Sequence, residues 1–353
     1  MSADPTPGDD AAGDRGLGRR GRKLLATMPH IIAYPGADYV LAPYVNCALR
    51  PGMDTGTIRA DAYGYRVTHD PHGIVDSRTW LARPRRALAL GNSFLLGWCC
   101  SGDAATIPSY LSAKTPYSFL NLGLAGASSL QETIAGIPFL DQAELVVIIS
   151  GIGNVQHYLE HTRDYDLYGA FFSQHLYLGT SQTPVRQLSA LHQQDTSADV
   201  ELARERLARH AAAHAVPKQQ WSAAEVRERH DLAVQHHFRD LRLLRRALNP
   251  GTHLLYALQP VSCLAKPVLE PDEVALHAAL HRMPMWKDIF EPYVIPGLPD
   301  YIDALRRNCE ALGVPCVDLS QVDYRGFCFV DYVHTTDTAN EQIADYLAER
   351  LPA

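Results

Sequence analysis

The chain has 353 residues, of which 46% are hydrophobic and 20% are charged, a composition ordinary for a soluble globular protein. This length suffices for one large domain with insertions or for two domains. A formal net charge of −7 argues against a general nucleic-acid-binding protein, which normally carries a basic face.

The N-terminal 27 residues are rich in Asp, Gly, Ala and Arg, and we expect them to form a disordered tail. The apolar residues that follow the basic run 19–23 are interrupted at once by Pro29 and His30, unlike an export signal. No stretch approaches the ~20 apolar residues of a membrane span. Seven cysteines form no CxxC pair, which is typical of buried thiols in a reducing compartment. We therefore expect a cytoplasmic protein.

Two structural regions are expected after the tail. Residues 28–84 are rich in Tyr, Pro and Gly, which favours short strands and turns in an N-terminal β-rich elaboration. Residues 85–353 contain apolar segments that predict five strands, separated by helical patterns, at 87–90, 118–122, 145–149, 253–258 and 314–319. Helices are expected from 128 to 140 and from 340 to 351. This alternation predicts a parallel sheet covered by helices.

A long insertion lies between the third and fourth predicted strands, over about residues 157–245. Helices are expected at 199–213 and from 223 to about 248, so that the insertion forms a helical cap. It holds many of the 16 histidines, and His210 and His214 are one helical turn apart. No third ligand follows at a zinc-like spacing, so we expect surface histidines and no metal. A core role is preferred over a pocket lining for its aromatic residues Tyr165, Tyr168, Phe171, Phe172 and Tyr177.

Ser93 is the first candidate catalytic residue. The segment Gly91-Asn92-Ser93 directly follows the first predicted strand and precedes a predicted helix. Parallel strands present such residues at their carboxyl ends, where open α/β folds bind ligands. A serine hydroxyl needs a neighbouring base to become a nucleophile, and helix capping is its alternative role here.

A base and oxyanion donors are found further along the chain. Asp331 precedes His334 by three residues, so that its carboxylate can hold one ring nitrogen while the other faces a nucleophile. Gly126 and Asn154, which we expect at the ends of the second and third strands, can supply a backbone N–H and a side-chain amide to an oxyanion. A turn glycine and a loop cap are their structural alternatives.

These segments resemble the SGNH (GDSL-like) hydrolase family over about residues 85–351. The resemblance implies a flavodoxin-like three-layer α/β/α fold with a five-stranded parallel sheet. It also implies that Ser93 is the nucleophile and an oxyanion donor, with Gly126 and Asn154 as further donors, His334 as general base and Asp331 as its partner. No cofactor or metal is implied, and the substrate would be a small or carrier-bound acyl compound.

The chain departs from the family pattern at three positions. Asn92 replaces the usual Asp before the nucleophile, Val155 replaces an Asp after Asn154, and Ile152 stands where a glycine is usual. These departures leave a non-catalytic binding protein open. Acyl transfer to an acceptor other than water also stays open, because a helical cap that excludes water would favour a bound alcohol or amine. Arg66 is expected to be a surface residue, with binding of an acidic substrate group as its alternative.

A dinucleotide site is disfavoured. Gly151 and Gly153 begin a G-x-G-x-x-G pattern, but Gln156 takes the place of the third glycine. The pattern also follows the third predicted strand rather than the first.

Overall fold

The computed structural model describes residues 26–34, 39–42, 44–160, 167–170, 220–280 and 285–352. The disordered tail expected up to residue 27 lies outside them except for residues 26 and 27, and the helix expected at 199–213 lies outside them entirely. Within the described part of the chain, no helix combines the length and the apolar character needed to cross a membrane.

The centre of the molecule is a parallel sheet, as predicted. Its five strands are β5 (Arg86–Gly91), β6 (Ser118–Gly123), β7 (Leu145–Ser150), β8 (His253–Leu258) and β9 (Cys316–Asp318). Their order in the sheet is β6-β5-β7-β8-β9, and every neighbouring pair is parallel. Counted along the chain this is the order 2-1-3-4-5, which is the flavodoxin-like order.

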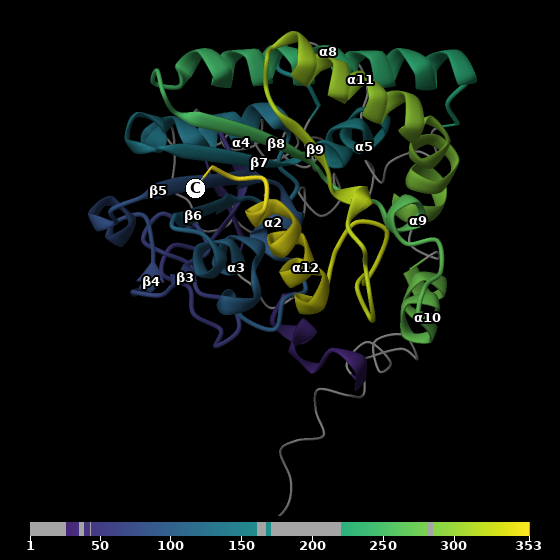
Figure 1. The fold of residues 1–353 in the computed structure, drawn as a ribbon. Coiled ribbons are helices and arrows are strands. Elements are labelled where there is room, and N and C mark those ends of the chain that lie inside the picture. Colours follow the sequence, from purple (N-terminus) through teal and green to yellow (C-terminus); the bar gives the residue numbers. More distant parts are fainter. Residues whose placement is uncertain are drawn as a thin grey trace, which may run out of the picture.

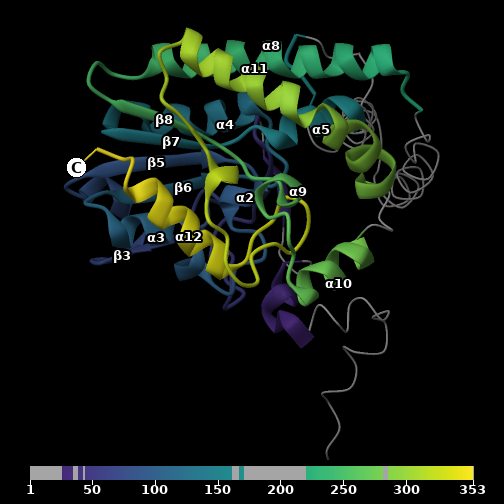
Figure 2. The same ribbon diagram turned by 45° about the vertical axis from the view of Figure 1, so that its right-hand side comes forward.

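Helices cover both faces of the sheet, so the fold has three layers (Figures 1 and 2). Successive strand residues point to opposite faces. Thus Leu88 and Leu90 belong to one apolar cluster, together with residues of the helices on that face, which are α4 (Ser129–Gly136), α5 (Ile152–Glu160), α8 (Ala223–Ala247) and α11 (Leu298–Ala311). Ala87 and Ala89 belong to a second cluster, on the face covered by α3 (Ile107–Lys114) and α12 (Asp337–Ala348).

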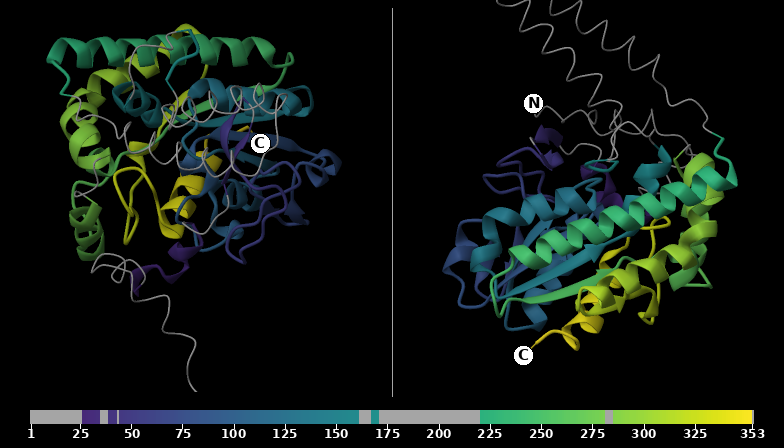
Figure 3. Two further views of the ribbon diagram at one scale, coloured as in Figure 1. Left: turned by 180° about the vertical axis from the view of Figure 1, so that it is seen from behind. Right: turned by 90° about the horizontal axis from the view of Figure 1, so that it is seen from above.

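Helix bounds differ from the predicted ones where proline or capping residues intervene. The helix expected over 128–140 ends as an α-helix at Gly136 and continues as the 3-10 helix η4 (Ile137–Gln142), where Pro138 cannot donate a backbone hydrogen bond. The helix α8 begins at a capping box formed by Ser222 and Glu225 and ends within one residue of the expected position. Figure 3 shows it lying across the sheet beside α11.

Two antiparallel hairpins form in the N-terminal elaboration. β1 (Tyr39–Ala42) pairs with β2 (Asn46–Leu49), and β3 (Thr68–Asp70) pairs with β4 (Gly73–Val75). Cys47 in β2 also pairs with Ala125, so the first hairpin lies beside the loop that follows β6.

The other helical elements are short or lie in the C-terminal half of the chain. They are α2 (Ser93–Leu96), α9 (Ser262–Ala265), α10 (Pro271–Leu280), the π-helix η5 (Met285–Val294), and the 3-10 helices η1 (Pro29–Ala33), η2 (Thr79–Ala82), η3 (Asp103–Ala105), η6 (Ile295–Gly297) and η7 (Leu319–Gln321).

Candidate active site

Three predicted site residues lie just beyond the carboxyl ends of neighbouring strands. Ser93 follows β5, Gly126 follows β6 and Asn154 follows β7, and β5 lies between the other two strands. The strand order reverses between β5 and β7, which is where open α/β sheets form a ligand-binding crevice.

Ser93, His334 and Asp331 form a continuous hydrogen-bonded array. Ser93 Oγ lies 2.9 Å from His334 Nε2, and His334 Nδ1 lies 2.7 Å from Asp331 Oδ2. The other oxygen of Asp331 accepts the backbone N–H groups of Val333 and His334, at 2.8 and 2.7 Å. The structure therefore brings Ser93 to hydrogen-bonding distance of a histidine 241 residues further along the chain, and an aspartate in turn holds that histidine.

The electrostatics of Asp331 set the tautomer of the histidine. Burial raises the pKa of this carboxyl, but the charge and hydrogen bond of His334 and the two backbone N–H groups outweigh it, so the pKa lies below its usual value. An ionised carboxylate only accepts hydrogen bonds. In the neutral imidazole, Nδ1 of His334 therefore carries the proton, and Nε2 is left to accept the proton of Ser93.

Asn92 positions the short helix α2 that Ser93 begins. Its side-chain oxygen caps the helix by accepting the N–H of Phe94 at 3.0 Å, and its Nδ2 donates to Oε1 of Gln259 at 3.0 Å. A carboxylate could not donate that second bond, so the amide matches the partner that this chain provides. Sequence reasoning missed Gln259, although its position directly after the fourth strand placed it at the same sheet edge.

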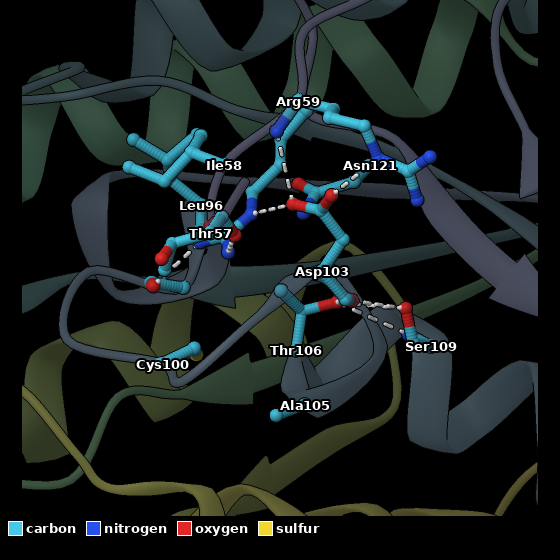
Figure 4. Close-up of polar contacts among 12 residues, drawn as sticks. Thr57, Ile58, Arg59, Leu96, Cys100, Asp103, Ala105, Thr106, Ser109 and Asn121 are labelled. Carbon is cyan, nitrogen blue, oxygen red and sulfur yellow. Dashed lines mark hydrogen bonds and ion pairs between the residues drawn. The ribbon is translucent and has the colours of Figure 1, made fainter. Parts of the chain in front are cut away.

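Arg66 supports the other end of α2, and its predicted surface position is wrong. The side chain is fully buried and donates to Asp103 Oδ1 at 2.8 Å and to the Gly97 carbonyl at 2.8 Å. Figure 4 shows Asp103 facing Arg59, which donates to its other oxygen at 3.1 Å. Because the arginine is sealed inside the protein by these partners, it is not a substrate-binding group.

Asn154 has one satisfied and one unsatisfied end. Its side chain is 3% exposed, and Oδ1 accepts the backbone N–H of Ser129 at 2.8 Å. Nδ2 is buried and has no hydrogen-bond partner among the described residues. Leaving such a donor unpaired costs about 1–3 kcal/mol, which a hydrogen-bond acceptor bound at this position would recover.

The expected position of Asn154 at the end of a strand is wrong in detail. Gly151 turns the chain in a left-handed conformation, with φ of 124°, and α5 begins at Ile152, so Asn154 lies in the first helical turn. Ile152 and Val155 are 1% and 0% exposed and pack into the apolar cluster of that face. An ionised carboxylate at position 155 would lose its hydration there, which costs free energy.

Gly126 lies in the loop after β6. Its φ of 64° is a left-handed conformation that favours glycine, and the preceding residue Ala125 pairs with the first hairpin. The left-handed backbone therefore explains why a glycine stands at this position. The oxyanion role expected for its N–H stays a prediction.

An aromatic cluster adjoins His334 and was not predicted. The ring of Trp98 lies 6.2 Å from that of His334, and the rings of Tyr34 and Tyr39 lie 5.0 and 6.1 Å from Trp98. Trp98 follows Ser93 by five residues, and its backbone N–H donates to the Ser93 carbonyl at 3.0 Å. This proximity was already implied by the sequence. Of the insertion aromatics considered above, only Tyr168 is described, and it is exposed.

A second group of buried polar side chains lies between the sheet and α8. Glu132 accepts Ser150 Oγ at 2.5 Å, and burial raises its pKa to about 8. His237, Tyr256 and Glu132 line one small cavity, and burial lowers the pKa of His237 to about 3.

The surface position expected for the insertion histidines is wrong for His237, and for His157, which is 3% exposed. Among the residues with described positions, no group of three or more metal-ligating side chains is found.

The comparisons with known proteins find resemblance only at the level of structures. No protein-family model matches the sequence, and no curated protein matches it. The chain is similar to the native aryl esterase of M. smegmatis, with 14% identity, a TM-score of 0.39, and coverage of 75% of this chain and 97% of that chain.

Two further solved structures are similar. One is a G-D-S-L family protein from Desulfitobacterium hafniense, with 9% identity, a TM-score of 0.40, and coverage of 75% of this chain and 99% of that chain. The other is a carbohydrate acetylesterase from Sinorhizobium meliloti, with 12% identity, a TM-score of 0.40, and coverage of 75% and 97%. The strand order in the sheet, rather than these resemblances, defines the fold.

Proposed function

We propose that this protein is a serine-dependent acyl hydrolase of the SGNH type, acting on an ester or thioester. The observation that carries the proposal is the array from Ser93 Oγ through His334 to the ionised Asp331, with contacts of 2.9 and 2.7 Å. A helix-capping serine would not require a base at hydrogen-bonding distance, whereas a nucleophilic serine does.

The proposed reaction begins when Ser93 Oγ attacks the acyl carbonyl carbon and its proton passes to Nε2 of His334. The resulting imidazolium is stabilised by Asp331. As the tetrahedral intermediate collapses, the bond to the alcohol or thiol breaks, and the leaving group takes the proton from Nε2. Water then attacks the acyl-serine and gives its proton to Nε2 of His334. The bond between the acyl carbon and Ser93 Oγ breaks, Oγ takes that proton back, and the carboxylic acid is released.

The negative oxygen of the intermediate would be stabilised by the backbone N–H groups of Ser93 and Gly126 and by the side-chain amide of Asn154. The Nδ2 group of Asn154 supports this role, because it has no partner among the described residues while Oδ1 of the same amide is held by Ser129. Donors held in advance at this position cost no reorganisation during the reaction.

The substrate that we propose is a small or carrier-bound acyl compound in the cytoplasm. No cofactor takes part in the proposed steps. The same acyl-serine would form if an alcohol or amine replaced water in the second half of the reaction, so acyl transfer remains the alternative activity.

The experiment that tests the proposal is intact-protein mass spectrometry after treatment with a fluorophosphonate probe, run beside Ser93→Ala. We expect one adduct, on Ser93, in the unmodified protein and none in the variant. Turnover of a small ester should be lost in Ser93→Ala, and addition of candidate acceptor alcohols then distinguishes hydrolysis from transfer. Absence of an adduct on folded protein would replace the proposal by the non-catalytic binding protein.

A further inference from the structure

The amide of Asn154 is connected to a buried carboxylate on α8. The N–H of Ser129 that holds Asn154 Oδ1 belongs to the first residue of α4. The hydroxyl of the same serine donates to Oδ2 of Asp240 at 2.6 Å. Thus two bonds of one residue join Asp240 to the proposed oxyanion donor.

Asp240 is placed so that both of its oxygens are occupied. The residue is 1% exposed, and its Oδ1 accepts Nε of Arg239 at 2.7 Å. The guanidinium of Arg239 donates in turn to the carbonyl oxygens of Leu167 and Tyr168, which lie in the insertion. A buried carboxylate is costly unless it is paired. Here the hydrogen bonds lead on one side through Arg239 to Leu167 and Tyr168, near the start of the insertion, and on the other side to Ser129 in α4.

We infer that Asp240 is a positioning residue for the oxyanion hole, an inference that rests on the proposed function. By holding Ser129, it fixes the backbone N–H that donates to Asn154 Oδ1, and thereby the direction of Nδ2. An amide rotates about its terminal torsion with little preference, so its orientation depends on such partners. A donor displaced by about 1 Å can cost up to ~100-fold in rate.

The competing explanation is that Asp240 only stabilises the packing of α8 on α4. In that case its removal would lower the free energy of unfolding and leave turnover by the folded protein unchanged. The two explanations differ in whether the effect of Asp240 passes through Asn154, which a double-mutant cycle measures directly.

The experiment compares Asp240→Ala, Asn154→Ala and the double variant, in the full chain, with p-nitrophenyl acetate as substrate. Asp240→Asn keeps an acceptor for the Ser129 hydroxyl, and Ser129→Ala keeps the backbone N–H while removing the bond to Asp240. Arg242→Ala is the matched control, because Arg242 is an exposed residue of the same helix. Thermal unfolding of each variant establishes that the folded protein is assayed.

For Asp240→Ala we expect kcat to fall by ~10-fold or more with little change in KM, since a transition-state contact is weakened. The kcat of Ser129→Ala should fall similarly, and Asp240→Asn should retain most of its kcat. The kcat and KM of Arg242→Ala should equal those of the unmodified protein. In the Asn154→Ala background, Asp240→Ala should change kcat by less than ~2-fold.

A change in kcat of less than ~2-fold on adding Asp240→Ala to Asn154→Ala supports the inference. An equal fold-change in both backgrounds, or unchanged kcat in folded Asp240→Ala, overturns it. If Asp240→Ala does not fold, the same cycle is read with Ser129→Ala in its place. Failure of the proposed function is seen separately, as the absence of fluorophosphonate labelling at Ser93 in the unmodified protein.

Discussion

Glu132→Gln should change how the stability of the protein depends on pH. Glu132 is 3% exposed, and burial raises the pKa of its carboxyl from 4.5 to about 8, with the nearby charge of Asp240 adding to the shift and the bond from Ser150 opposing it. Glutamine has the same shape, stays neutral at every pH and can accept the Ser150 hydroxyl through its amide oxygen. The substitution therefore removes the titration and keeps the contact.

The sign of the effect follows from proton binding in the two states. Below pH 4.5 the carboxyl is protonated in the folded and the unfolded chain alike. Between pH 4.5 and about 8 the folded chain retains a proton that the unfolded chain has released, so stability falls as pH rises. Each pKa unit of difference corresponds to about 1.4 kcal/mol, so the loss over this window is on the order of a few kcal/mol.

The assay is urea-induced unfolding at intervals from pH 5 to pH 9, for the unmodified protein, Glu132→Gln and Glu310→Gln. Glu310 is an exposed residue of α11 and serves as the control. We expect the free energy of unfolding of Glu132→Gln to exceed that of the unmodified protein increasingly as pH rises toward 8. Parallel curves for the two proteins would refute the reasoning, since they would mean that Glu132 titrates alike when folded and unfolded.

Three further variants test the site and its support. Asn154→Ala should lower kcat by ~10²–10³ and leave KM nearly unchanged, as measured with a small ester; a change confined to KM would contradict its role as an oxyanion donor. Asp331→Asn should lower kcat by about 10⁴ with a small residual activity, because the histidine loses the partner that sets its tautomer; near-normal turnover would speak against the array. Glu273→Ala should destabilise the protein by ~3–5 kcal/mol in urea unfolding, because the carboxylate pairs with the buried Lys266 at 2.5 Å and accepts two backbone N–H groups just before Asp331. A loss under ~1 kcal/mol would show that the buried pair is dispensable.

Local patterns in the sequence determined the elements and their class. Continuous apolar runs such as 145–149 predicted strands buried on both faces, and the helical stretches between them required parallel connections. The placement of Ser93 directly after a strand, and the three-residue spacing of Asp331 and His334, are also local features. The position of Ser93 just after β5 and the contact of Asp331 with His334 agree with these local patterns, because strand ends and short spacings are encoded by neighbouring residues.

Only the tertiary structure decided which distant groups meet and how they are oriented. The 2.9 Å contact of Ser93 with His334 depends on the order of strands in the sheet, which no local pattern specifies. The burial of Arg66 and the pairing of Asn92 with Gln259 likewise arise from segments brought together by packing. The amide of Asn154 is oriented by Ser129, on another helix, whose backbone N–H donates to Oδ1. Such orientations follow from the summed packing of the whole chain, so they are absent from any short stretch of sequence.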